Sequence, residues 1–179
     1  MRRYIYFVFL LCCAVNLLLT SCVRQKYVVM DMVHHNPGEA MTESKFLDPS
    51  FLKKNEYGAK VFFLFEAAQF GIDWKSFDPS LFPDTTEAGR WVAEKAEIIH
   101  KKYDAAKKED LQVYCMLDML VLPSLLVEKH RTELTNEQGK LDISKPYTQL
   151  CIRELMKEMF ETFPQLDGLV IRTGETYLH

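Results

Sequence analysis

Acidic, imidazole, amide and guanidinium side chains follow four apolar runs of the chain, at the point where each run ends. They are His34, His35, Asn36 and Glu39 after the first run, Glu66 and Gln69 after the second, Asp118 after the third, and Arg172, Thr173 and Glu175 after the fourth. These groups offer hydrogen-bond donors and acceptors in pairs. A ligand rich in hydroxyl groups, such as a sugar, is therefore the type of molecule that they can hold.

The carboxyl groups of this set suggest a reaction. Hydrolysis of a glycosidic bond commonly uses two of them, one to protonate the leaving oxygen and one to attack carbon or activate water. Glu175 is the first choice for the acid, because it lies just after a buried apolar run. Arg172 can orient it or hold a substrate carboxylate bidentately. Glu66 and Asp118 are candidate partners, and the second carboxylate can equally belong to a part of the protein beyond this chain.

An aromatic segment follows the second apolar run and contains Phe70, Trp74, Phe77 and Phe82. Trp74 can offer a flat apolar face to a pyranose ring, so we expect it to contact substrate. Each candidate also has a structural alternative. Trp74 can pack under its own loop, the two histidines can hydrogen-bond loop backbone, Glu66 and Asp118 can form internal ion pairs, and Arg172 can pair with Glu66 or Glu175.

The elements that position these residues follow from the hydrophobic pattern. Apolar runs predict strands at 27–33, 59–65, 111–117 and 169–171. Capping signals predict a short helix after Asp48, a helix that begins at one of residues 84–86 and continues to about Ala106, and a helix capped by Ser144 that ends before Pro164. Residues 120–145 are predicted to form a long loop.

Strands that alternate with helices indicate parallel βαβ units, so the fold class is α/β. The loops after the strands are long, and the turns before them are short. This asymmetry is typical of a (β/α)8 barrel, whose working loops all lie on the carboxyl face. Such a barrel has about 250 residues, more than the chain provides. We therefore expect the first four strands of a truncated barrel.

The first 22 residues have the features of an export signal. Met1-Arg2-Arg3 is basic, residues 4–19 are almost all apolar, and Leu19-Thr20-Ser21-Cys22 follows. The last four residues resemble the bacterial lipobox, which predicts lipidation of Cys22 and a lipid anchor in the bacterial cell envelope. The alternative is a transmembrane anchor, for which the apolar run is short of about 20 residues. The expected organisation is a signal peptide at 1–21, a tether at 22–26 and the barrel half at 27–179.

Composition excludes several classes of protein. The chain has 179 residues, of which 48% are hydrophobic and 26% charged, so it is expected to be globular. The net charge of -3 and the lack of a basic stripe argue against nucleic-acid binding. No Cys or His spacing indicates a metal site, and no glycine-rich motif indicates a nucleotide cofactor. Cys115 and Cys151 are expected to be buried thiols.

A family resemblance supports the pattern. The run Phe163-Pro164-Gln165-Leu166-Asp167-Gly168, which leads into Val170-Ile171-Arg172-Thr173-Gly174-Glu175-Thr176-Tyr177, resembles exported bacterial (β/α)8 glycoside hydrolases, loosely the α-glucuronidase and hexosaminidase-like groups. The run His34 to Glu39 looks like a first-strand active-site loop of the same type. Glu175 follows Gly174, so the chain lacks the Asp-Glu pair typical of hexosaminidases and the Asn-Glu pair typical of another large clan of barrel enzymes.

The leading hypothesis is a carbohydrate-active lipoprotein that hydrolyses glycans by carboxylate acid/base catalysis. The resemblance implies Glu175 as the catalytic acid and a carbohydrate as substrate. The 179-residue chain alone is expected to be inactive, because half a barrel lacks half of the loops that build the site. Two alternatives remain: a non-catalytic surface glycan-binding lipoprotein on the same scaffold, and a small α/β domain with a structural or partner-binding role.

Overall fold

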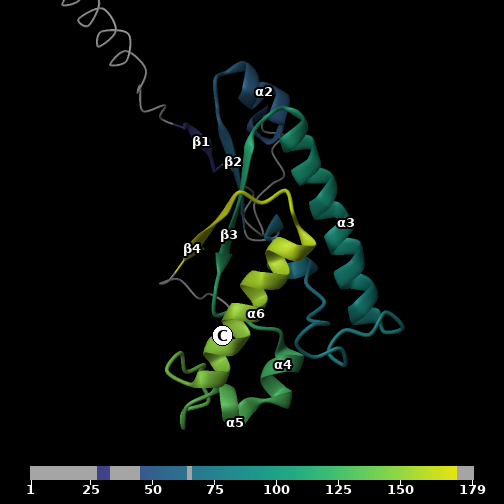
Figure 1. Cartoon of the computed structure of the whole chain (residues 1–179), viewed down its shortest axis with the longest axis vertical. Helices are drawn as coiled ribbons and strands as arrows, with labels where there is room; N and C mark the ends of the chain where they lie inside the picture. Colours follow the sequence, from purple (N-terminus) through teal and green to yellow (C-terminus); the bar gives the residue numbers. More distant parts are fainter. Residues whose placement is uncertain (1–27, 33–44, 64–65, 173–179) are drawn as a thin grey trace, which may run out of the picture.

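The structure is a computed structural model that describes residues 28–32, 45–63 and 66–172. It confirms an α/β fold, with one sheet of four parallel strands arranged in chain order, β1-β2-β3-β4 (Figure 1). The strands are β1 (Met30–Asp31), β2 (Ala59–Phe62), β3 (Gln112–Asp118) and β4 (Gly168–Arg172). Each strand therefore pairs with its neighbours in the sequence.

Helices connect the strands. They are α2 (Pro49–Lys54), α3 (Glu87–Lys108), α4 (Ser124–Lys129), α5 (Arg131–Leu134) and α6 (Pro146–Thr162), with 3-10 turns η1 (Lys45–Leu47) and η3 (Ala68–Gly71). The segment 120–145 was expected to be a loop, but it contains α4 and α5. The expectation was wrong there because these helices are only six and four residues long, too short to show a clear 3.6-residue period.

The capping residues that start the helices were predicted in part. The Asp48 carboxylate accepts from the backbone N–H of Ser50 at 2.9 Å, and the Thr86 hydroxyl accepts from Gly89 N–H at 3.0 Å. Both helices begin where the sequence indicated. The prediction for Ser144 is wrong, because Lys145 is the N-cap of α6 and makes no side-chain cap. The Ser144 hydroxyl instead donates to Asp142 at 2.6 Å.

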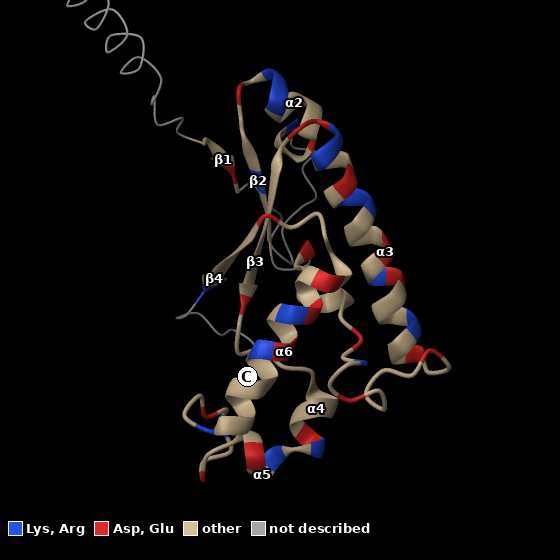
Figure 2. Cartoon of the chain, viewed as in Figure 1, with Lys and Arg blue, Asp and Glu red and all other residues tan. Residues whose placement is uncertain are grey.

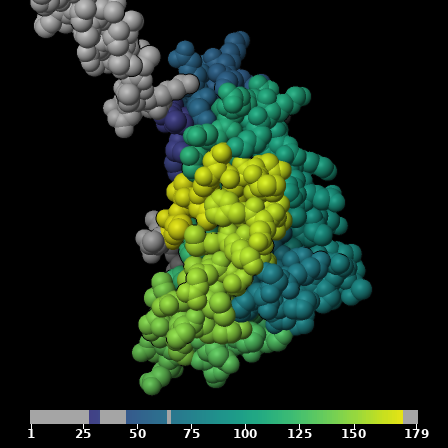
Figure 3. Space-filling view, viewed as in Figure 1, coloured from purple at the N-terminus to yellow at the C-terminus, as the bar shows by residue number. Residues whose placement is uncertain are grey.

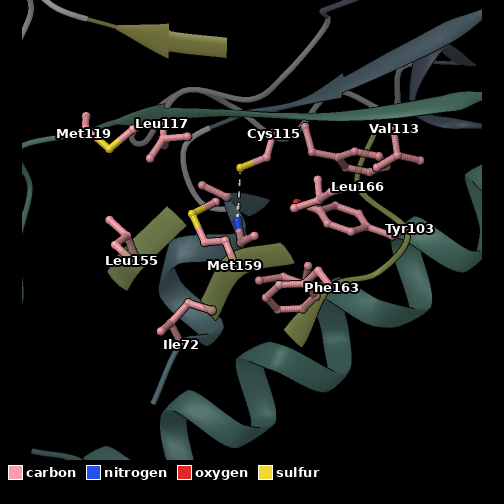
Figure 4. Close-up of a cluster of buried hydrophobic side chains, with 14 of the residues drawn as sticks. Ile72, Tyr103, Val113, Cys115, Leu117, Met119, Leu155, Met159, Phe163 and Leu166 are labelled. Atoms are coloured by element: carbon pink, nitrogen blue, oxygen red, sulfur yellow. Dashed lines mark hydrogen bonds between the residues drawn. The ribbon is translucent and has the colours of Figure 1, made fainter. Parts of the chain in front are cut away.

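One face of the sheet, here called the first face, packs against the helices. Alternation along β3 turns Val113, Cys115 and Leu117 toward this side, and all three side chains are 0% exposed. Figure 4 shows them facing side chains from the η3 segment, α3, α6 and the turn after α6: Ile72, Tyr103, Leu155, Met159, Phe163 and Leu166. In Figure 3, α6, α3, the segment before α3 and the α4–α5 region cover this side, with β1 at the margin.

The second face carries the alternate residues of each strand: Met30, Ala59, Val61, Gln112, Tyr114, Met116, Asp118, Gly168, Val170 and Arg172. The apolar residues Ala59, Val61 and Met116 are buried, yet they do not belong to the main core cluster. A Cβ on Gly168 would lie 2.8 Å from the ring of Tyr114. Gly168 therefore lets this ring lie directly over β4.

A buried ion pair joins β1 to β2. Lys60 Nζ lies 2.7 Å from Asp31 Oδ2, and both side chains are 3% exposed. Lys60 Nζ also donates to the backbone carbonyl of Phe46 at 3.1 Å. Because a buried charge is costly unless it is paired and hydrogen-bonded, this pair holds the two-residue strand β1 in register on the sheet.

Removal of one partner of this pair should destabilise the fold strongly. We expect Lys60→Ala to lower the free energy of unfolding by about 3–5 kcal/mol, because Asp31 would remain buried without its partner. Lys53→Ala is the matched control, since the Lys53–Asp110 pair at 2.8 Å is exposed and should contribute less than about 1 kcal/mol. Urea unfolding of both variants checks this. Equal losses of unfolding free energy in the two variants would contradict the conclusion that the buried Lys60–Asp31 pair holds β1 on the sheet.

The thiol of Cys115 makes stability depend on pH. It accepts from the backbone N–H of Ala68 at 3.1 Å (Figure 4), and burial raises its pKa to about 11. The pKa of this thiol in the folded state lies above the unfolded value of about 8.5. Its contribution to the free energy of unfolding is therefore full below about pH 8.5 and is lost as the pH rises toward 11.

We therefore expect the wild-type protein to lose about 1–2 kcal/mol more than Cys115→Ala between pH 8 and 10. Urea unfolding at the two pH values measures the difference. Parallel losses in the two proteins would show that this thiol does not stay protonated in the fold.

Candidate functional site

A bidentate ion pair connects the carboxyl ends of β3 and β4. Arg172 Nε donates to Asp118 Oδ1 at 2.7 Å, and a terminal guanidinium nitrogen donates to Oδ2 at 3.0 Å. The two residues are register partners, so both point to the second face. Figure 2 shows the acidic end of β3 beside the basic end of β4. The sequence placed both groups at strand ends, but it offered Glu66 or Glu175, and not Asp118, as the partner of Arg172.

The pair is largely shielded from water. The side chain of Asp118 is 9% exposed and that of Arg172 is 19% exposed. The guanidinium carbon also lies 5.5 Å from the ring centroid of Phe63, within range of a cation–π contact. Two parallel hydrogen bonds and an aromatic ring thus fix the plane of the guanidinium group. A guanidinium group held in one plane is suited to bind a planar carboxylate or a pair of hydroxyl groups.

Glu66 does not join this pair. Its carboxylate forms an ion pair with Lys102 of α3, and its backbone carbonyl accepts from the Tyr103 hydroxyl at 3.1 Å. Glu66 therefore faces α3, whereas Arg172 pairs with Asp118. Of the two partners proposed for Arg172 from the sequence, Glu66 is excluded in this structure.

Trp74 lies in the hydrophobic core. Its exposed fraction is 1%, and its ring meets Phe77 edge to face at a centroid distance of 6.0 Å. Its φ of 58° is in the left-handed region, which is strained for a residue with a bulky side chain. The structure therefore matches the alternative that Trp74 packs under its own loop. The expected flat face toward a sugar finds no support in the described geometry.

Seven other residues singled out from the sequence lie outside the described residues: Cys22, His34, His35, Asn36, Glu39, Thr173 and Glu175. Their roles stay predictions. Within the described part of the chain, the structure brings together Asp118 and Arg172 and separates both from Glu66 and Trp74.

Two features escaped the sequence analysis. Glu158 of α6 is 6% exposed and accepts from the backbone N–H of Ser76 at 3.1 Å, and from the Ser76 hydroxyl, so it ties the aromatic loop to the helix. The second feature is a cavity of about 170 Å³ beside this loop, lined in part by Trp91. The sequence contains one signal for each feature. A glutamate lies next to the apolar stripe of α6, and a tryptophan lies on the solvent side of α3.

Among residues 28–32, 45–63 and 66–172, no group of three His, Cys, Asp or Glu side chains is placed to hold a metal ion. The helices of this part of the chain are also too short or too polar to cross a membrane.

Comparison with known proteins yields no relative: no protein-family model, curated protein or solved structure matches this chain.

A double-mutant cycle will measure the Asp118–Arg172 pair. We expect a coupling energy of about 1.5–3 kcal/mol, because a charged hydrogen bond that is shielded from water is stronger than an exposed one. Arg172→Lys should not restore the stability, since lysine cannot make the bidentate contact. The Glu66–Lys102 pair, whose side chains are 32% and 42% exposed, is the control and should couple by less than about 1 kcal/mol. Equal coupling energies for the two pairs would contradict the conclusion that the Asp118–Arg172 contact is bidentate and shielded from water.

Proposed function

We propose that the chain is the amino-terminal part of a (β/α)8 barrel glycoside hydrolase, in which Arg172 binds substrate and Glu175 is the acid catalyst. The observation that carries this proposal is the Asp118–Arg172 pair at the carboxyl ends of two neighbouring parallel strands. Ligands collect at this edge in α/β barrels. The pair also points away from α3 and α6, to the side that becomes the interior of a barrel.

The arrangement of the sheet supports a barrel. Its strands follow one another in chain order, as the strands of a (β/α)8 barrel do. Arg172 on β4 also reaches the ring of Phe63, which directly follows β2. These strands are separated by β3, and therefore by about 10 Å of sheet. Contact across β3 is expected when the sheet curves around its second face.

The apolar residues of the second face support the same conclusion. Parallel sheets usually have both faces covered, yet the described helices pack on the first face. Met30 on the second face is 39% exposed, although it is apolar. Ala59, Val61 and Met116 of this face are already buried, so further strands that continue the curvature from β4 would cover what remains open around Met30, in the manner of a barrel interior.

The chemistry follows from the pair. Asp118 holds the Arg172 guanidinium in one orientation, so the arginine can present hydrogen-bond donors to a sugar carboxylate or hydroxyl group. Glu175 follows Arg172 by three residues in the sequence and would meet the same substrate as a proton donor. The second carboxylate would come from a later loop, at a spacing that sets a retaining or inverting outcome. Lipidated Cys22, at the start of the mature chain, would anchor the enzyme at the bacterial envelope.

A non-catalytic glycan-binding lipoprotein is the second candidate. The observation that favours it is that both candidate acids in the described part of the chain are ion-paired: Asp118 with Arg172, and Glu66 with Lys102. Neither of these carboxylates is then available as a nucleophile or base without breaking its pair. In that case the fixed guanidinium group binds a glycan, and no reaction follows.

An assay of glycan hydrolysis by the natural gene product separates the enzyme from the non-catalytic binding protein. We expect hydrolysis of at least one member of a panel of aryl glycosides and envelope or plant polysaccharides, among them uronic acid-containing ones. Glu175→Gln should lower kcat by about 10²–10⁴-fold, because it removes the proton donor, and should leave the melting temperature unchanged. Glu137→Gln, at an exposed loop tip, is the control.

Unchanged kcat in Glu175→Gln would remove this residue from the mechanism. Glycan binding with no hydrolysis of any member of the panel would overturn the enzyme and favour the binding protein.

A further inference from the structure

Four apolar residues of α6 and β4 form an incompletely covered surface on the first face, here called the α6–β4 surface: Ile152, Met156, Phe160 and Ile171. The three residues of α6 are spaced by four positions, so they lie in one row along the helix. Phe160 is 40% exposed. Ile171 of β4 is 46% exposed, although its register partner Leu117 is fully buried on the same face of the sheet.

The row on α6 faces the β4 side of the sheet. The other flank of the helix carries Glu158, which accepts from the backbone N–H of Ser76. It also carries Tyr147, whose ring centroid lies 5.6 Å from that of Phe77. Ser76 and Phe77 belong to the loop after β2, so this flank faces the β2 side. Because a helix turns by about 100° per residue, Met156 lies on the flank opposite to Glu158.

The position of Phe160 indicates that a helix covers this surface. Phe160 projects from α6 and therefore lies in the helix layer, above the sheet. A fifth strand beside β4 would extend the sheet but would not reach this ring. Rows of side chains spaced by four residues are the ridges with which helices most often pack against one another. A helix laid along this row would cover Phe160 and reach Ile171 on the strand below.

The topology indicates where such a helix comes from. The four strands are parallel and follow one another in chain order, and α3 and α6 both pack on the first face. Right-handed crossovers place each connecting helix on the same side. Among the described strands, β4 pairs with β3 alone. A parallel fifth strand on the open edge of β4 would therefore bring its connecting helix to the first face, beside α6.

The charges beside the row specify the partner further. Arg153 and Lys157 are exposed on the solvent side of the row, and Lys157 has only a loose pair with Glu154 at 3.9 Å. A helix that packs here with acidic residues along its margin would pair with both cations. The fitting partner is thus an amphipathic helix with an apolar face and an acidic border.

We propose that the α6–β4 surface is the docking site of an amphipathic helix that connects β4 to a fifth strand in the natural gene product. The proposal rests on the barrel of the proposed function. It concerns the outer layer of that barrel, whereas Asp118 and Arg172 point to the second face. It can therefore hold for a barrel that hydrolyses glycans and for one that only binds them.

A photo-cross-linking experiment on the natural gene product tests the proposal directly. Phe160 is replaced by p-benzoylphenylalanine, the protein is irradiated, and the cross-linked peptides are identified by mass spectrometry. We expect a cross-link within one chain, to an amphipathic segment that follows residue 179. The same replacement at Ile98, which is 49% exposed on α3, is the matched control and should give no cross-link to that segment.

A pair of substitutions provides a second measurement. Phe160→Asp should lower the melting temperature of the natural gene product by about 3–6 °C, because it removes apolar contact and places a charge under the docked helix. Ile98→Asp changes a residue of similar exposure and should lower the melting temperature by less than about 2 °C.

Three results would overturn the docking site: no cross-link from position 160 to a segment after residue 179, a cross-link between two copies of the chain, or equal shifts in melting temperature for the two substitutions. The assay of glycan hydrolysis is independent of these results. A cross-link in a protein that hydrolyses no glycan would overturn the enzyme alone. Hydrolysis without the cross-link would overturn the docking site alone.

Discussion

The placement of helices on one face of a parallel sheet is the constraint on which the rest of this structure depends. Parallel neighbours joined by right-handed crossovers in chain order must carry their connecting helices on the same side. The first face thereby gains a core of fully buried side chains from β3, α3 and α6. Among the described residues, the second face carries the side chains of the strands, which end in the Asp118–Arg172 pair.

The two faces have different chemistry as a result. The first face holds the apolar cavity, where the loop after β2 is fixed by the buried carboxylate of Glu158. The second face ends in the Asp118–Arg172 pair, where two charges share one bidentate contact.

The sequence predicted much of this fold, because periodicity and strand ends are local signals. The apolar runs located the strands, and the ends of these runs placed Asp118 and Arg172 at strand ends, but the sequence did not indicate that the two residues pair. The choice of partner was not predictable, since Glu66, Asp118 and Glu175 all lie after strands and the register decides between them. Register and the path of a loop depend on contacts between distant residues.

Trp74 illustrates the same limit. Its residue type suits both a sugar platform and a core position, and composition cannot separate the two. A left-handed backbone and the packing of Phe77 determine the outcome, and neither is visible in the sequence. Ser144 is a smaller example, because the hydroxyl group that suggests a helix cap is occupied by Asp142 in the preceding turn.

The most direct measurement of the central claim is the side-chain Nε–H resonance of Arg172, followed by NMR during titration with a uronic acid-containing oligosaccharide. If the pair at the strand ends is the substrate site, this resonance shifts in a saturable way, while that of Arg153 on the outer part of α6 stays constant. A titration that binds the sugar but leaves the Arg172 resonance unmoved would contradict the account.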